Sequence, residues 1–409
     1  MLTRLTFIGL STSIGLVVGA GFGLPAQADD LAPEVVATVS VGAGPWGVAI
    51  TPDSRRAFIG NSGEAGGGNN VSVIDLESGS VIRQVSTTLG RAAGVAITPN
   101  GQFALAASFA EFGTVSRIET GSYTVAESGI VNTNALSIAA SPDNQYVYVV
   151  CEFGQVWRVD VNDLNLRTSL ETPLDGTFDI AVNATQQVYV GGNSTGKVSI
   201  VGDSVRFGTL TSVGTAVALS PDGNTAYVGD TGGRFYVFDL TVSNWNSVVA
   251  TYSLGGDIRG IAVTPDGRQA YVTDRNGNTV RVVDLSNGEI LYTIPVGSAP
   301  QRVAISAHGR TAVVTNNAGG TVSIISIPAQ PASGEPGSVP AAPLQQFIRA
   351  DGETCDRVPD GFVDFPGISE SLRNIGWAPS WAQWVHEGRG GPVCTRQPFF
   401  TSTGTWSVR

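Results

Sequence analysis

The stretch Gly47-Val48-Ala49-Ile50-Thr51-Pro52-Asp53 decides the fold, because it joins an apolar strand to a tight turn. Pro favours the second position of a type I turn, and Asp bonds locally to the backbone. We therefore expect this stretch to form a hairpin with the strand that follows it. The same turn recurs as Thr98-Pro99-Asn100-Gly101, Ser141-Pro142-Asp143-Asn144, Ser220-Pro221-Asp222-Gly223 and Thr264-Pro265-Asp266-Gly267.

Two further copies of the turn are degenerate. They are Asn183-Ala184-Thr185-Gln186 and Ser306-Ala307-His308-Gly309, and an apolar triplet precedes each of them as in the other copies. The turns therefore begin at positions 51, 98, 141, 183, 220, 264 and 306. Their mean spacing of about 42 residues is the length of one four-stranded propeller blade.

The remaining strands of each repeat can also be recognised in the sequence. A third strand reads Val280-Arg281-Val282-Val283-Asp284-Leu285, and a fourth begins at Ile290 after an Asn-Gly turn. The last repeat lacks a fourth strand, whereas residues 35–42, at the start of the repeat region, copy the fourth-strand pattern. We therefore predict an all-β, seven-bladed propeller over residues 34–328, whose last blade is closed by the N-terminal strand.

The composition excludes several other classes of protein. Of the 409 residues, 14% are charged, 42% are hydrophobic and 52 are glycine, and the net charge is -11. Disorder requires low hydrophobicity with high charge density, and coiled coils require many Ala, Glu, Lys and Leu residues. A pI of about 4.7 with the single lysine Lys197 argues against nucleic acid as a partner.

Residues 1–28 have the features of a secretory signal peptide. Arg4 gives a positive start, residues 7–24 are apolar, and Ala26-Gln27-Ala28 forms a small-x-small cleavage site. The apolar stretch is nearly long enough for an uncleaved membrane anchor, which is the alternative. We expect no transmembrane span in the mature chain and a secreted, periplasmic or cell-envelope location.

The repeats resemble a known family. The stretch at 47–53, together with residues 268–274 and 321–325, is similar to the YVTN-type (YncE-like) β-propeller repeat. The resemblance covers roughly residues 34–328 and implies the propeller fold. It leaves function open, because such propellers serve as binding platforms, as cell-surface proteins or, in related propellers, as lactonases and lyases.

A different composition begins after the repeats. Residues 329–343 form a linker rich in Pro, Ala, Gly and Ser, and residues 344–409 contain four of the seven tryptophans with Cys355 and Cys394. We expect a disulfide between these cysteines in a small module, and a buried Cys151. Two short helices are predicted at residues 369–376 and 379–386. The tryptophans form either the core of this module or a platform for carbohydrate.

The sequence offers little for catalysis. His308 and His386 are the two histidines, and His308 lies in a strand turn on the face opposite the usual ligand site. Residues 274–278 alternate oxygen-bearing side chains as in a calcium loop, but an ordinary turn explains them better because Thr279 and Leu285 replace the required Gly and Glu. We predict no catalytic residue, no metal and no cofactor.

A ligand would bind at the mouth of the central channel. Repeat alignment places polar and aromatic residues there, either at the start of first strands or after second strands. The predicted ligand-binding residues are Trp46, Glu152, Asp230, Arg259, Asp274 and Arg302, and Asn61, Phe178, Asn193, Gln301 and Asn316 lie at equivalent positions.

These observations favour an exported, non-catalytic scaffold, expected to be monomeric, that binds a protein or a cell-wall ligand at the cell envelope. One alternative is an extracytoplasmic lactonase-type hydrolase or lyase that uses carboxylates at the channel mouth. The second alternative is attachment to the cell wall or to carbohydrate through the Trp-rich module.

Overall fold

The computed structural model describes residues 32–328 with short gaps, together with the backbone of five strands beyond residue 328. The gaps are residues 64–68, 88–89, 111, 133, 171–176, 186–187, 193–196, 202–205 and 243–247. The chain divides into two compact units, Met1–Pro328 and Ala329–Arg409.

The first unit consists of seven four-stranded antiparallel sheets, which we call blades 1 to 7. Blade 1 contains β2 (Pro45–Ile50), β3 (Arg56–Asn61), β4 (Asn70–Asp75) and β5 (Ser80–Ser86). Blade 2 contains β6 (Arg91–Ile97), β7 (Phe103–Phe109), β8 (Gly113–Glu119) and β9 (Val125–Asn132). Blade 3 contains β10 (Ala135–Ala140), β11 (Tyr146–Cys151), β12 (Val156–Asp160) and β13 (Arg167–Leu170).

The other blades repeat this order along the chain. Blade 4 contains β14 (Thr177–Val182), β15 (Val188–Gly192), β16 (Lys197–Val201) and β17 (Arg206–Thr209). Blade 5 contains β18 (Gly214–Leu219), β19 (Thr225–Asp230), β20 (Arg234–Asp239) and β21 (Val248–Ser253). Blade 6 contains β22 (Ile258–Val263), β23 (Gln269–Asp274), β24 (Thr279–Asp284) and β25 (Ile290–Pro295). Blade 7 contains β26 (Pro300–Ile305), β27 (Thr311–Asn316), β28 (Thr321–Ser326) and β1 (Glu34–Ser40).

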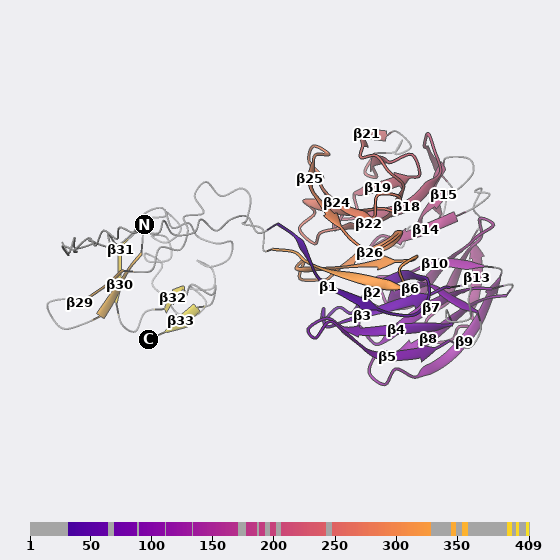
Figure 1. Ribbon diagram of the computed structural model, residues 1–409, viewed down its shortest axis with the longest axis horizontal. Helices are drawn as coiled ribbons and strands as arrows, with labels where there is room; N and C mark the ends of the chain where they lie inside the picture. Colours follow the sequence, from indigo (N-terminus) through magenta and orange to yellow (C-terminus); the bar gives the residue numbers. More distant parts are fainter. Residues whose placement is uncertain are drawn as a thin grey trace, which may run out of the picture. The chain divides into compact units, whose positions relative to one another are not determined.

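The blades form a closed ring around a central channel. The first strand of each blade contacts the first strand of the next, and β26 of blade 7 contacts β2 of blade 1. The outer strands β5, β13, β21 and β25 lie at the rim (Figure 1). Strand β1 pairs with β28 in antiparallel register, with Glu34 opposite Ser326. The N-terminal strand therefore closes the last blade.

Burial on both faces explains why the middle strands read as continuous apolar runs. All six residues of β23 are buried, whereas β21 alternates between partly buried and exposed positions. Hydrophobic clusters lie between neighbouring blades, and Ile59 of blade 1, for example, packs with Val313 and Ile324 of blade 7. Strands that are covered on both sides have little room for charge, which accounts for the low charge content of the chain.

The recurrent Thr/Ser-Pro-Asp turn is held by its own side chains. In blade 1 the Thr51 hydroxyl donates to Asp53 Oδ1 at 2.5 Å, and the backbone N–H of Arg55 donates to the same oxygen at 3.1 Å. In blade 7 His308 Nδ1 takes the place of the carboxylate, lying 3.0 Å from Ser306 Oγ and accepting the N–H of Arg310 at 3.1 Å. The degenerate turn therefore keeps the same hydrogen-bond pattern.

The structure confirms an all-β propeller of four-stranded blades. Every regular element in the described part of the chain is a strand. The proposed signal peptide and both predicted helices lie outside the described residues. Among the described residues there is no helix of the length and hydrophobicity needed to cross a bilayer.

The second unit contains two small sheets. Strands β29 (Gln345–Ile348), β30 (Thr354–Val358) and β31 (Gly391–Cys394) form one, and β32 (Pro398–Phe400) and β33 (Trp406–Val408) form the other. Cys355 and Cys394 are directly opposite each other in the β30–β31 register. Opposed residues of antiparallel strands have Cα atoms about 4.5–5.5 Å apart, which is within the range of a disulfide. The side chains of this unit lie outside the described set, so the disulfide stays a prediction.

Candidate functional site

One strand position recurs at the channel end of every blade. It is the residue of the second strand that pairs with the last first-strand residue before the register shift, and it is occupied by Asn61, Ser108, Cys151, Gly192, Asp230, Asp274 and Asn316. Wherever the side chain at this position is described, it is buried. We call this the inner position. Asp230 and Asp274, both expected to bind ligand, occupy it.

The Asp230 carboxylate is fully occupied by its own blade. Its Oδ1 accepts the backbone N–H groups of Gly232 and Arg234, each at 2.9 Å, and its Oδ2 accepts the hydroxyl of Tyr236 at 2.9 Å. These bonds fold the turn between β19 and β20. Asp230 therefore stabilises the turn beneath the mouth.

Asp274 stabilises the equivalent turn in blade 6. Its Oδ1 accepts the N–H groups of Asp257, Asn276 and Gly277 at 3.0–3.2 Å, and its Oδ2 lies 2.7 Å from Arg281 Nη2. The calcium-like spacing at residues 274–278 thus belongs to a turn. In the described part of the chain, no three His, Cys, Asp or Glu side chains are grouped to hold a metal ion.

Where the structure describes it, the residue that follows the inner position lies toward the mouth instead. A cavity of about 450 Å³ opens there and is bordered by four of these residues, Ser62, Phe109, Glu152 and Asn317. Because side chains alternate between faces along a strand, a shift of one position separates Glu152 from the buried inner position. The rest of the cavity lining comes from Gly44, Trp46, Gly63, Arg91, Ala93, Leu136 and Phe178.

The wall of this cavity is mainly apolar and aromatic on blades 1 to 4. Trp46, Leu136 and Phe178 each lie within the bulge of a first strand and contribute to the lining. Two phenylalanines on the loops after second strands, Phe112 of blade 2 and Phe153 of blade 3, are each 65% exposed. Exposed aromatic side chains around a hollow are typical of an interaction surface.

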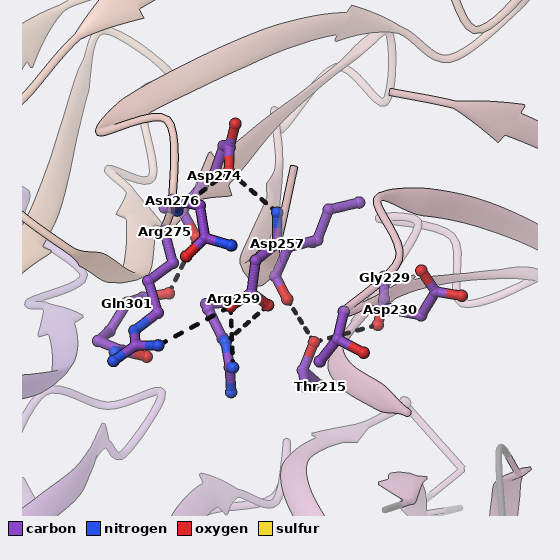
Figure 2. A network of polar contacts seen from close by, with 12 residues as sticks. Thr215, Gly229, Asp230, Asp257, Arg259, Asp274, Arg275, Asn276 and Gln301 are labelled. Atoms are coloured by element: carbon purple, nitrogen blue, oxygen red, sulfur yellow. Dashed lines mark hydrogen bonds and ion pairs between the residues drawn. The ribbon is translucent and has the colours of Figure 1, made fainter. Parts of the chain in front are cut away.

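The mouth at blade 6 carries a charged network. The Asp257 carboxylate makes a two-point contact with Arg259, with both N–O distances 2.9 Å, and Arg275 Nη1 lies 3.9 Å from the same group. Figure 2 shows Asp257 between Asp274 and Arg259. The backbone N–H of Asp257 donates to Asp274, so Asp257 connects both arginines to Asp274. Arg259, a predicted ligand residue, is thus paired with Asp257.

Arg302 reaches from blade 7 to the first strands of other blades. Its Nη2 lies 3.4 Å from Asp179 Oδ1 of blade 4, and it donates to the carbonyl oxygens of Phe178 at 2.6 Å, Thr215 at 3.2 Å and Arg259. Burial lowers the pKa of Arg302 and raises the pKa of Asp179, and the attraction between the two opposes both changes. Arg302 therefore links blades 4, 5, 6 and 7 to each other.

Small residues allow this crossing. The position of Arg302 is the one directly before Val303, and in the other blades the equivalent residues precede Val48, Val95, Ile138, Ile180, Val217 and Ile261; they are Gly47, Gly94, Ser137, Asp179, Ala216 and Gly260. A Cβ at Gly260 would lie 2.6 Å from the carbonyl oxygen of Gln301. The first strands thus approach each other too closely for larger side chains at most of these positions.

This architecture recurs in solved structures. The fold is that of a β-propeller. The propeller is similar to Kuenenia stuttgartiensis hydrazine synthase, with a TM-score of 0.63, 18% identity and coverage of 76% of this chain and 100% of that chain. It is also similar to the Myceliophteria thermophila Cps50 (Swd1) β-propeller domain, with a TM-score of 0.62, 13% identity and coverage of 73% and 100%.

A third similar structure is that of the RRP9 WD40 repeats, with a TM-score of 0.64, 13% identity and coverage of 72% of this chain and 97% of that chain. Identities this low establish the fold alone. No family model matches the chain, and no curated protein does.

The propeller brings only part of the predicted site together. Trp46, Phe178 and Glu152 border one cavity, Arg259 belongs to the charged network, and Arg302 lies in the channel below. Asn61 and Asn316 are buried at the inner position with Asp230 and Asp274, Gln301 is buried, and Asn193 lies outside the described residues.

Sequence reasoning missed Asp179, Asp257 and the exposed Phe153. Asp179 had a signal, because it is the only acidic residue at a first-strand position that otherwise holds Gly, Ala, Ser or Arg. Phe153 had one as well, since it directly follows the predicted Glu152.

Proposed function

We propose that this protein is an exported interaction scaffold, a YVTN-type seven-bladed propeller that binds a partner protein at its channel mouth. Export is supported by the apolar stretch at residues 7–24 with the Ala26-Gln27-Ala28 site. The blade repeats and the β1–β28 closure support the propeller type. Residues 344–409 form a separate module joined through residues 329–343.

The observation that carries this proposal is that the aspartates at the inner position already use their carboxylate oxygens within their own blades. A hydrolase or lyase of the lactonase type needs carboxylates with oxygens available to substrate or metal. The oxygens of Asp230 and Asp274 are occupied by backbone N–H groups, a tyrosine and an arginine. The mouth presents an aromatic-walled cavity with the carboxylate of Glu152, held by Asn134, at its edge, and Phe153 is exposed next to Glu152 in the chain. This surface suits a side chain of another protein.

Selection of peptides on the immobilised propeller tests this proposal. A phage-displayed library of random peptides should yield binders to the wild-type protein. Phe153→Ser should remove most of this binding, because exposed aromatic residues at a contact carry a large part of its energy. The matched control is Leu166→Ser, since Leu166 is 62% exposed in the same blade but lies in the turn between β12 and β13, at the opposite end.

Comparison of the two variants shows which surface binds the peptides. Binding that depends on Phe153 and tolerates Leu166→Ser supports the mouth as the interaction surface. Binders that lose affinity equally for both variants, or for Leu166→Ser alone, would place the interaction elsewhere. Turnover in a panel of lactones that is abolished by Asp274→Asn would instead revive the enzymatic alternative.

A further inference from the structure

Among the residues that the structure describes, Glu152 is the one carboxylate that borders the mouth cavity. The amide nitrogen of Asn134 donates to its Oε2 at 2.5 Å, and the backbone N–H of Glu152 donates to the carbonyl oxygen of Asn134 at 3.1 Å. Both contacts join the loop after β11 to the residue before β10. They hold the carboxylate at the edge of the cavity, and neither of them neutralises its charge.

The other described carboxylates around the channel are engaged within the protein: Asp230 accepts two backbone N–H groups and the Tyr236 hydroxyl, and three others have a cationic partner. Asp257 faces Arg259, Asp179 faces Arg302, and Asp274 faces Arg281. In the part of the chain that the structure describes, none of the ion pairs includes Glu152. A negative charge that is fixed in place without an intramolecular cation suits a cation supplied from outside.

The aromatic walls of the cavity also favour a positively charged ligand. Trp46 and Phe178 border the cavity with Glu152, and Phe153 is exposed one residue further along. Aromatic faces attract cations through the negative potential above the ring, most strongly when the cation is partly removed from water. A carboxylate and aromatic rings at one cavity therefore act on a cationic group in the same direction.

We propose that the cavity receives an arginine or lysine side chain of the partner protein, whose charged group pairs with Glu152 while its aliphatic part packs between Trp46 and Phe178. This inference rests on the proposed function and names the chemistry that the mouth recognises. Long basic side chains fit such a site because they combine an apolar stem with a charged head.

Arg91 would favour a negatively charged ligand instead. It borders the same cavity, and a partner carboxylate could approach it. Its guanidinium, however, lies over the ring of Phe109, 4.7 Å from the centroid. This contact already engages the Arg91 charge with the protein's own aromatic ring. We therefore take Glu152 as the residue that selects the ligand, and Arg91 becomes a test of the alternative.

Short peptides of defined charge can test the inference. The probes are acetylated and amidated Gly-Gly-Arg-Gly-Gly, its Lys counterpart and its Glu counterpart, observed by ligand-detected NMR with the full-length protein. The Arg and Lys peptides should bind saturably. Glu152→Gln should weaken them by about tenfold or more, as expected for loss of a charge-assisted contact. The control Glu77→Gln removes the same charge from the exposed turn after β4 and should leave binding unchanged.

Three results would overturn the inference. The first is equal binding of the Arg peptide by wild type and Glu152→Gln, and the second is no saturable binding of the Arg or Lys peptide. The third is binding of the Glu peptide that Arg91→Gln abolishes. Any of these three results rejects the cationic ligand. If the peptides selected from the phage library still depend on Phe153, the scaffold function stands.

Discussion

Arg302 of blade 7 and Asp179 of blade 4 form an ion pair across the central channel, with 3.4 Å between Nη2 and Oδ1. Asp179 is held from two more blades, because Ser137 Oγ of blade 3 donates to it at 3.0 Å and the N–H of Val217 of blade 5 donates at 3.1 Å. One buried carboxylate thus joins four blades. The pair connects strands that are far apart in the chain, so its loss should destabilise the whole ring.

We predict that Arg302→Met lowers the free energy of unfolding by about 3–5 kcal/mol, because it leaves the Asp179 charge buried without its cation. Urea denaturation followed by circular dichroism measures this change. The double variant Arg302→Met with Asp179→Ala should recover a substantial part of the loss, since it removes the stranded charge. A double variant no more stable than Arg302→Met would contradict the assignment of the pair as the cause.

A glycine substitution tests the close approach of the first strands. Gly260→Ala should cost about 1–3 kcal/mol of unfolding free energy, because its Cβ would lie 2.6 Å from the carbonyl oxygen of Gln301 and 2.9 Å from the Cα of Arg302. The control is Gly121→Ala, where no atom lies within 4 Å of the added carbon. Equal stability of the two variants in thermal denaturation would show that the ring has more space than the structure indicates.

The aspartates of the turns make stability depend on pH in the acid range. A hydrogen bond from Thr51 lowers the pKa of Asp53, and one from Ser220 lowers the pKa of Asp222. A carboxyl whose pKa is lower in the folded state stabilises the fold above its unfolded value, near 4, and this contribution disappears as the pH falls through the folded pKa. The urea midpoint should therefore decrease below about pH 4.

The variant with both Asp53→Asn and Asp222→Asn should show a smaller decrease over the same range. Asparagine can keep the turn, because Asn100 already accepts the Thr98 hydroxyl at 2.7 Å and the N–H of Gln102 at 3.0 Å in blade 2. A double variant with the full wild-type pH dependence would assign the acid sensitivity to other groups.

The cysteines allow a count of thiols. Burial raises the pKa of Cys151 to about 12, so this thiol should not react with Ellman's reagent in the native protein. With Cys355 and Cys394 bonded after oxidative expression, denaturant without reductant should expose one reactive thiol, and prior reduction should expose three. Three thiols in denaturant before reduction would exclude the disulfide.

Sequence reasoning predicted the fold well because turns and strands are local features that repeat. The Thr/Ser-Pro-Asp pattern marks the hairpin between first and second strands, and the Asp53 contacts explain why it is needed. The closing strand was also predictable, since residues 35–42 resemble the fourth strands. His308 shows how a degenerate copy keeps its function through a different atom.

The site was harder to predict because one position along a strand separates a buried side chain from one at the mouth. Asp230 is the last residue of its apolar second strand and occupies the inner position, whereas Glu152 comes directly after its second strand, one residue beyond that position. The repeat pattern alone does not distinguish these two positions. The Asp179–Arg302 pair joins residues more than a hundred positions apart, and no local pattern indicates that they meet.

The β1–β28 closure also determines how the propeller responds to tension. Glu34 and Ser326 are opposite each other at one end of this strand pair, and Ser40 and Thr321 are opposite at the other. A force that separates the chain before Glu34 from the chain after Ser326 therefore loads the hydrogen bonds of the pair one after another, starting at that end. The ring should open at low force by unzipping at this seam, while blades 1 to 6 keep their strands paired.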